Sequence, residues 1–217
     1  MASKTDASVY ISRVGKADSS VKCCASPEDL AGLTEMVDQA AELLVPEDAL
    51  DVVAYACTSG TAISGLRSVE AKVRAVRPGV AVTTPLNAVC KAFAQHEIRK
   101  ISAVMPYRRE ISNLVAKFLK AEGIETIRLG FFGLESDSDM GRLSLDCLTE
   151  AVLEVDTPDS EAIFLSCTAL RTADLIQQLE DRIGKMVVTS NQAMFWHCLR
   201  LAGNRQEIQG FGRLMQS

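Results

Sequence analysis

The sequence predicts an α/β protein of two pseudo-symmetric, Rossmann-like lobes, each built on a parallel sheet, with the functional site between them. Short apolar runs alternate with amphipathic stretches of helical period, and the connections between them are short. An internal repeat is the second observation: residues 51–62, DVVAYACTSGTA, and residues 161–172, EAIFLSCTALRT, share one layout 110 positions apart (167 minus 57). In each segment an apolar run ends in a Cys-Thr pair, as at the carboxyl end of a buried parallel strand. Two such pairs in matching frames indicate a duplicated half.

Composition places the chain among globular proteins with free thiols. The 217 residues are 47% hydrophobic and carry a formal net charge of -5, without a basic cluster or an apolar run long enough to cross a membrane. Nucleic acid and membrane are therefore not expected as partners. The seven cysteines form no CxxC motif, and the N-terminus lacks the apolar core of a signal peptide. We expect a cytoplasmic protein with reduced thiols and no metal.

In the first half, strands and helices are expected to alternate. Residues 8–14, SVYISRV, are rich in β-branched and aromatic residues and predict a short strand. A helix is expected to begin after Ser26, with Pro27 in its first turn, and to end at Pro46. The other expected elements of this half are strands over residues 52–56 and 79–84 and helices over residues 61–76 and 87–93.

The second half continues this alternation. Residues 134–142, LESDSDMGR, are expected to form a polar loop because they are rich in Ser and Asp. The expected strands cover residues 101–105, 126–132 and 186–189, with one more ending at Cys167, and the expected helices cover residues 111–121, 143–153, 172–183 and 192–201. Such regular alternation favours a parallel sheet, or two of them.

A second internal match supports the duplication. Residues 82–88, VTTPLNA, match residues 187–193, VVTSNQA, at a shift of 105 (189 minus 84). The second half also has a leading strand over residues 101–105, for which the first half has no counterpart. We therefore expect residues ahead of the sequence shown to supply a missing first strand, because its absence would leave backbone groups unpaired. The lobes are expected to cover residues 1–99 and 100–217, with the C-terminal helix free to pack on the first lobe.

Cys57 and Cys167 are the candidate catalytic residues. A thiol at a strand end, followed by the amides of a helix start, lies in a field that favours thiolate, and small residues behind it let N–H groups approach a carboxylate. Two thiols about 6–10 Å apart across one crevice suit the removal of a proton from one face of a carbon and its return to the other. Alternatively, one thiolate attacks a carbon–carbon double bond. A lone cysteine is more often a packing residue, so the prediction depends on the matched pairs.

Other residues carry weaker predictions. Tyr107 follows a strand and is either a hydrogen-bond donor to substrate or an ordinary loop aromatic. The vicinal pair Cys23-Cys24 is either a redox pair or two loop thiols, and we favour loop thiols. The remaining candidates lack metal-ligand spacing and are expected as packing or surface residues on helices: Cys90, Cys147, Cys198, His96 and His197.

Four segments together resemble the aspartate/glutamate racemase superfamily: AYACTSG, TTPLNA, the strand-end Pro-Tyr and SCTAL. The most similar branch contains maleate cis–trans isomerases, arylmalonate decarboxylase and ectoine-utilisation proteins. The likeness covers nearly the whole chain from about Val9, and residues 9–14 with the helix after them look most like the ectoine-utilisation proteins. The resemblance implies two similar α/β lobes with the active site between them, and neither a metal nor an organic cofactor.

The resemblance also implies roles for individual residues. Cys57 and Cys167 match the catalytic cysteines of the family, and Tyr107 matches a tyrosine that contacts substrate in this branch. The segments that hold the substrate carboxylate are matched by Thr58, Ser59, Thr168 and Ala169, and we add Gly60 and Thr84 to the expected substrate-binding set.

The sequence departs from two members of this branch. Arylmalonate decarboxylases typically lack the first of the two cysteines, whereas Cys57 is present here. Maleate isomerases have an asparagine after the first strand and another in the loop that corresponds to residues 135–140. The first of those segments is absent here, and the second contains Ser and Asp but no Asn.

We therefore predict a cofactor-independent racemase, epimerase or cis–trans isomerase that acts on a small carboxylate through Cys57 and Cys167. One alternative is a decarboxylase with Cys167 as the proton donor. The other is a carboxylate-binding accessory protein without turnover. A homo-oligomer, dimer or higher, is expected.

Overall fold

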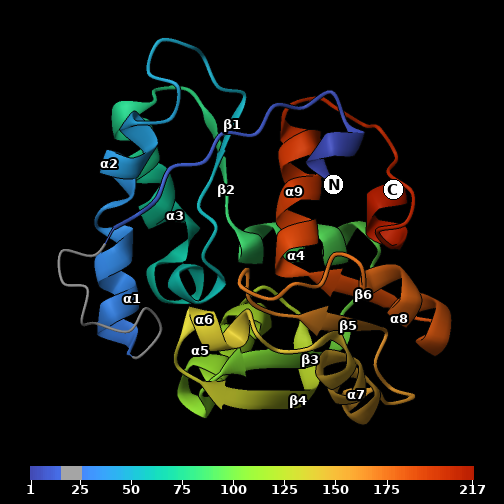
Figure 1. Ribbon diagram of the computed structural model, residues 1–217. Helices are drawn as coiled ribbons and strands as arrows, with labels where there is room; N and C mark the ends of the chain where they lie inside the picture. The colour runs from blue at the N-terminus through green and yellow to red at the C-terminus, as the bar shows by residue number, and fades with distance from the viewer. Residues whose placement is uncertain (16–25) are drawn as a thin grey trace.

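Two parallel sheets carry the fold of the computed structural model, which describes residues 1–15 and 26–217 (Figure 1). The first sheet pairs β1 (Val52–Ala54) with β2 (Ala81–Thr83). The second has the order β4-β3-β5-β6 and consists of β3 (Lys100–Tyr107), β4 (Glu125–Leu134), β5 (Ala162–Leu165) and β6 (Met186–Thr189). Each pairing between these strands is parallel, and the predicted α/β class is confirmed. The Cys23-Cys24 pair lies outside the described residues.

The helices follow the strands as the sequence predicts, with small shifts at their ends. α1 begins after Ser26, whose hydroxyl accepts a hydrogen bond from the Asp29 N–H at 3.1 Å, with Pro27 as the first helical residue. The single helix expected up to Pro46 is instead two helices. The α-helices are α1 (Pro27–Thr34), α2 (Val37–Glu42), α3 (Thr58–Val76), α4 (Pro85–Gln95), α5 (Arg109–Ala121), α6 (Asp137–Met140), α7 (Leu145–Val155), α8 (Ile176–Ile183) and α9 (Ser190–Leu201), and the 3-10 helices are η1 (Ala2–Lys4) and η2 (Arg213–Gln216).

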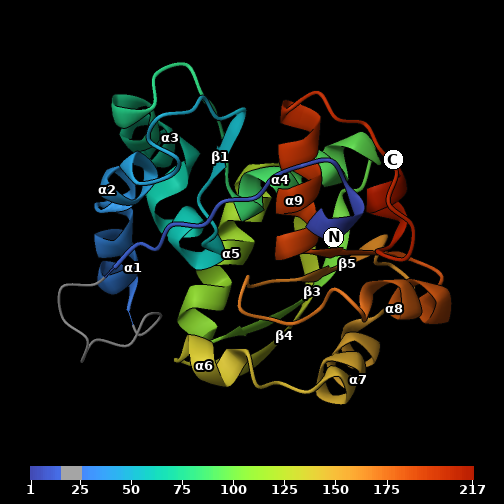
Figure 2. The same ribbon diagram turned by 45° about the horizontal axis from the view of Figure 1, so that its top comes forward.

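Helices α4 and α9 pack against each other between the two sheets (Figures 1 and 2). α9 contacts β1 and β2 as well as β6, so the C-terminal helix reaches the first sheet. Thr84 and Thr189 begin these helices in the same way: each side chain accepts a hydrogen bond from an N–H three residues ahead, at 3.3 Å and 3.2 Å. The equivalence supports the alignment of residues 82–88 with residues 187–193.

The two sheets differ in the number of neighbours of the strand that leads to each cysteine. β5 has β3 on one edge and β6 on the other, whereas β1 pairs only with β2 among the described residues. The strand predicted over residues 8–14 is wrong, because this segment forms no strand and exposes Val9, Tyr10 and Ile11, the last to 86%. β-branched residues favour an extended backbone, but a strand also requires a partner edge.

The buried apolar residues form a larger and a smaller cluster. The larger one surrounds the second sheet, where residues 101–107 of β3 are all buried, and extends over α4 and α9. The smaller one packs α3 against the first sheet through Val53, Val69, Val73 and Val82. Within the described part of the chain, no helix has the length and apolar character needed to cross a membrane.

Candidate active site

Cys57 lies at the carboxyl end of the first sheet, three residues after β1, and is the N-cap residue of α3. Its sulfur accepts a hydrogen bond from the Gly60 N–H at 3.3 Å, and the Thr61 hydroxyl donates to its carbonyl oxygen at 2.6 Å. A Cβ at Gly60 would lie 2.9 Å from this sulfur and 2.7 Å from the Tyr55 hydroxyl oxygen. A side chain at this position would therefore displace the Cys57 sulfur or the Tyr55 hydroxyl.

Cys167 lies at the carboxyl end of the second sheet, two residues after β5 and directly before a turn. Its backbone has a φ of 98°, a left-handed value that is costly for a residue with a side chain. The Ala169 N–H donates to its sulfur at 3.4 Å, and its thiol donates to the Met140 sulfur at 3.8 Å. The expectation that helix-start amides follow both cysteines is wrong here, because the next helix begins only at Ile176.

The two Cys-Thr motifs meet in space. The Thr58 hydroxyl donates to Ser190 Oγ at 2.9 Å, and the same oxygen accepts the Cys167 N–H at 3.0 Å. The Thr168 hydroxyl donates across the junction to the Ala56 carbonyl at 2.9 Å. The fold therefore brings together the strand ends that the repeat singles out.

Tyr107, at the end of β3, belongs to the same cluster. It is only 1% exposed, and its hydroxyl hydrogen-bonds the Cys167 sulfur and accepts from Ser166 Oγ at 3.5 Å. Burial raises the pKa of Tyr107 well above its usual value, and the negative charge that Cys167 or Cys57 gains when it ionises acts in the same direction. Tyr107 therefore remains a neutral hydrogen-bond donor beside the Cys167 sulfur.

Burial keeps both thiols protonated in this structure. It raises the pKa of Cys57, against the hydrogen bonds from the Gly60 amide and the Ser59 side chain, which lower it. It raises the pKa of Cys167 to about 12, although the Ala169 amide and the Tyr107 hydroxyl act in the opposite direction. The prediction of a thiolate-favouring field is therefore wrong for the structure as it stands, because desolvation outweighs the amides.

The loop expected over residues 134–142 contains α6, which lies beside the cysteines. Met140 is fully buried against the Cys167 sulfur, and the charge of Asp137 raises the pKa of both Cys57 and Cys167. The Arg108 side chain pairs with Glu135, which ties the start of this loop to the start of α5. The segment thus adds an acidic group and an apolar wall to the site.

The other predicted substrate-binding residues differ in what their side chains do. Ser59 is buried, with its hydroxyl oxygen 3.8 Å from the Cys57 sulfur, and Ala169 contributes the amide that contacts Cys167. Thr58 is buried and its hydroxyl is bound to Ser190, whereas Thr168 is partly exposed. Thr84 is fully buried, and its hydroxyl accepts from the Asn87 N–H as the cap of α4.

Sequence reasoning did not single out Ser190 and Asn191, which begin α9. The Asn191 amide group donates to the carbonyl oxygens of Thr168, at 2.9 Å, and Leu170, at 3.4 Å. Both residues lie within residues 187–193, the segment of the second internal match. That match was the available signal, because it placed these side chains directly after a strand end.

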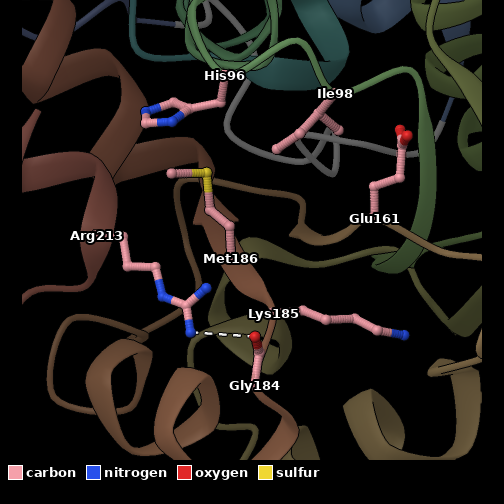
Figure 3. Close-up of a pocket in the computed structure, with 7 residues that line it drawn as sticks. All are labelled: His96, Ile98, Glu161, Gly184, Lys185, Met186 and Arg213. Atoms are coloured by element: carbon pink, nitrogen blue, oxygen red, sulfur yellow. Dashed lines mark hydrogen bonds between the residues drawn. The ribbon is translucent and has the colours of Figure 1, made fainter.

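A hollow of about 310 Å³ lies elsewhere, at the amino-terminal ends of β3, β5 and β6 (Figure 3). Its charged side chains already have protein partners. Lys185 pairs with Asp156 at 2.6 Å, Arg213 donates to the Gly184 carbonyl at 3.1 Å, and Glu161 accepts two backbone N–H groups. Parallel α/β sheets bind ligands at the carboxyl ends of their strands, so the cysteine cluster is the better candidate.

The histidines take part in packing. His197 Nδ1 lies 2.8 Å from the Thr83 hydroxyl oxygen, and His96 Nε2 lies 3.1 Å from the Ser217 hydroxyl oxygen. In residues 1–15 and 26–217, no three His, Cys, Asp or Glu side chains gather as a metal site would require.

The fold and this cluster define a class of protein: an α/β protein with two parallel sheets whose strand ends bring two cysteines together. The chain belongs to the family described as arylmalonate decarboxylase, whose model matches residues 23–215. Among curated relatives, arylmalonate decarboxylase from Bordetella bronchiseptica is 33% identical over 63% of this chain and 58% of its own length. Maleate isomerase from Alcaligenes faecalis is 24% identical over 88% of this chain and 78% of its own length.

Solved structures show the same fold. A doubly substituted arylmalonate decarboxylase in its liganded form superposes with a TM-score of 0.80 at 29% identity, covering 88% of this chain and 83% of that one. The maleate isomerase of Pseudomonas putida S16 gives a TM-score of 0.83 at 20% identity, covering 88% of this chain and 80% of that one. The α/β fold with parallel sheets is therefore common to this chain and both kinds of relative.

Proposed function

We propose that the protein is a cofactor-independent isomerase that acts on a small carboxylate, by racemisation, epimerisation or cis–trans isomerisation, with Cys57 and Cys167 as its catalytic thiols. The observation that carries this proposal is the junction of the two Cys-Thr motifs through Ser190. Four of the curated relatives are maleate isomerases. One matched structure, from Nocardia farcinica, is described as holding a covalently bound succinylcysteine intermediate.

The interaction between the two thiols favours a state in which one is deprotonated and the other protonated. Burial chiefly, and also a charge on Cys57, raise the pKa of Cys167, so the two thiols resist ionising together. One deprotonated and one protonated thiol is the state that two-base chemistry requires. We assign the base to Cys57, because it caps the positive end of α3, and the acid to Cys167.

The substrate carboxylate is proposed to bind the first-turn amides of α3. The leading N–H groups of a helix have no acceptor within the helix and attract anions. Thr58 and Ser59 supply these groups, beside the Cys57 sulfur, while Tyr107 donates from the opposite sheet. Thr168 and Ala169 form the other wall of the site. The proposal for Thr58 concerns its backbone amide, because its hydroxyl is engaged by Ser190.

Decarboxylation is the second candidate, because the family is described as arylmalonate decarboxylase and the Bordetella relative has that activity in its name. A buried Cys167 with a pKa raised to about 12 is a thiol that stays protonated, as a donor to an enediolate must. One matched decarboxylase is described as a variant in which a glycine is replaced by cysteine. Cys57 is native here, which favours the isomerase.

We also propose a localisation, an oligomeric state and a lobe boundary for the protein. We propose a cytoplasmic homo-oligomer, dimer or higher, whose lobes divide between residues 99 and 100. The closer likeness to ectoine-utilisation proteins also remains a prediction, since the relatives matched here are decarboxylases and isomerases.

The test is a substrate panel with the wild-type protein in deuterated water. Maleate, phenylmalonate and chiral 2-substituted carboxylates are incubated with protein, and products and deuterium content are measured by NMR. The C57S/C167S variant should lose all turnover, whereas the C90S variant, which changes a half-buried helix thiol, should keep it. Isomer formation or exchange supports the isomerase, and carbon dioxide release supports the decarboxylase. Binding without either reaction would overturn both and leave an accessory carboxylate-binding protein.

A further inference from the structure

Ser190 joins the two Cys-Thr motifs, but it has no part in the proposed proton transfers. It is the first residue of α9 and fully buried. Its hydroxyl is not needed to cap this helix, because Thr189 accepts the Gln192 N–H and the Gln192 side chain accepts the Thr189 N–H. The Ser190 oxygen instead accepts the Thr58 hydroxyl and the Cys167 N–H, from residues 132 and 23 positions away in sequence.

The bond to Cys167 stabilises an unfavourable backbone. With a φ of 98°, Cys167 adopts a strained conformation that persists only where the surroundings hold it. Ser190 fixes the N–H of this residue, and the adjacent Asn191 fixes the carbonyl oxygens of Thr168 and Leu170. The start of α9 therefore shapes the turn that aims the Cys167 sulfur.

The first half supplies an internal control for this interpretation. In the alignment of the two halves, Pro85 and Leu86 stand where Ser190 and Asn191 stand, and neither has a side-chain hydrogen-bonding group. The equivalent cysteine, Cys57, has an ordinary φ of -134° and donates its N–H to the Tyr55 carbonyl. At this position the second half, whose cysteine has a left-handed φ, has the hydroxyl of Ser190, whereas the first half has Pro85.

We propose that Ser190 is a positioning residue that sets the relative placement of the two cysteines, through its shared acceptor oxygen. One bond holds the first residue of α3, directly after Cys57, and the other holds Cys167 itself. The inference deepens the proposed function, because correct spacing of base and acid matters only if both act on one substrate. Misplacement of a reacting group by about 1 Å costs on the order of 100-fold in rate.

The test compares three variants of the full chain. S190A removes the acceptor, S190T retains a hydroxyl, and S102A is the matched control, because Ser102 is a fully buried serine whose hydroxyl has no hydrogen-bond partner. The readouts are kcat and KM, the melting temperature, and the rate of Cys167 alkylation from pH 7 to 10, followed by peptide mass spectrometry. The alkylation readout does not depend on knowing the substrate.

For S190A we expect kcat to fall about 10- to 100-fold with KM nearly unchanged, and the pH profile of Cys167 alkylation to shift. S190T should recover most of both losses, and S102A should match the wild type. A lower melting temperature with wild-type kcat and alkylation would overturn the inference and leave Ser190 a purely structural residue. A shifted alkylation profile in a protein without turnover on any substrate would retain the positioning role and reject the proposed function.

A second experiment covers the case in which S190A folds poorly. Glycine relieves left-handed strain, so C167G removes the need for backbone support. The loss of melting temperature caused by S190A should therefore shrink by about 2–4 °C when C167G is already present. An equal loss in both backgrounds would show that Ser190 does not act through Cys167, and would overturn the proposal.

Discussion

The two Cys-Thr motifs share their sequence but not their backbone. Cys57 is extended, with a φ of -134°, and leads directly into a helix, so that Thr58 is buried in the first turn. Cys167 has a φ of 98° and leads into a turn, so that Thr168 is partly exposed. Both motifs therefore follow a strand end, but only the second has its backbone hydrogen-bonded by the side chains of Ser190 and Asn191.

This difference also places different groups beside the two sulfur atoms. Cys57 receives an amide from the end of a helix, where the dipole favours negative charge. Cys167 receives one amide from a turn and a hydrogen bond from Tyr107, and stays protonated. Burial raises the pKa of both thiols, so the proposed assignment of base to Cys57 and acid to Cys167 depends on the helix dipole at Cys57.

The largest expected effect comes from exchanging each sulfur for oxygen. C57S and C167S should each lower turnover by about 10³-fold, because a hydroxyl is far too weakly acidic to replace a thiolate as base. In a two-base mechanism, each variant should retain hydrogen exchange with only one enantiomer, and with opposite preferences. NMR exchange on both enantiomers checks this. Equal residual exchange with both enantiomers in both variants would remove the functional distinction between the motifs.

The two threonines should differ in their contribution to stability. T58V removes a hydroxyl bound to Ser190 in a fully buried place and should lower the free energy of unfolding by about 1–3 kcal/mol. T168V removes a partly exposed bond to the Ala56 carbonyl and should cost less than about 1 kcal/mol. Urea unfolding measures both. Equal costs would contradict the different burial of the two motifs.

The raised pKa of Cys167 predicts a loss of stability in alkaline solution. The thiol stays protonated in the folded protein up to about pH 12, whereas the unfolded chain ionises it above about pH 8.5. Unfolding is therefore increasingly favoured as pH rises from about 8.5 toward 12. At pH 10 this linkage should cost about 1–2 kcal/mol relative to neutral pH, and C167S should lack it. A pH-independent difference between wild type and variant would contradict the burial of this thiol.

The smallest effect compares glycine with alanine at two cysteines. C167G should be more stable than C167A by about 1 kcal/mol, because alanine retains the left-handed strain. The order should be reversed at Cys90, which lies within α4, where glycine is about 1 kcal/mol worse than alanine. Thermal unfolding of the four variants measures this. The same order at both sites would argue against the unusual backbone of Cys167.

The sequence predicted those features that repeat or that follow from periodicity. The parallel sheets, the strand ends at Cys57 and Cys167 and the threonine caps of α4 and α9 all follow from local pattern. The left-handed Cys167 did not, because its φ is imposed by Ser190 and Asn191 from another element. The burial that raises both thiol pKa values was also missed, since desolvation depends on long-range packing, such as that of Met140 against Cys167, which short-range pattern does not specify.

Cross-linking of the two thiols measures whether the two Cys-Thr motifs form one site. A variant that keeps only Cys57 and Cys167, with the other cysteines changed to serine, is treated at pH 9 with 1,3-dichloroacetone. A matched variant keeps only Cys57 and Cys90. We expect one bridged peptide pair joining Cys57 to Cys167 in the first variant, and separate single adducts in the second. Separate adducts at Cys57 and Cys167 would contradict this expectation.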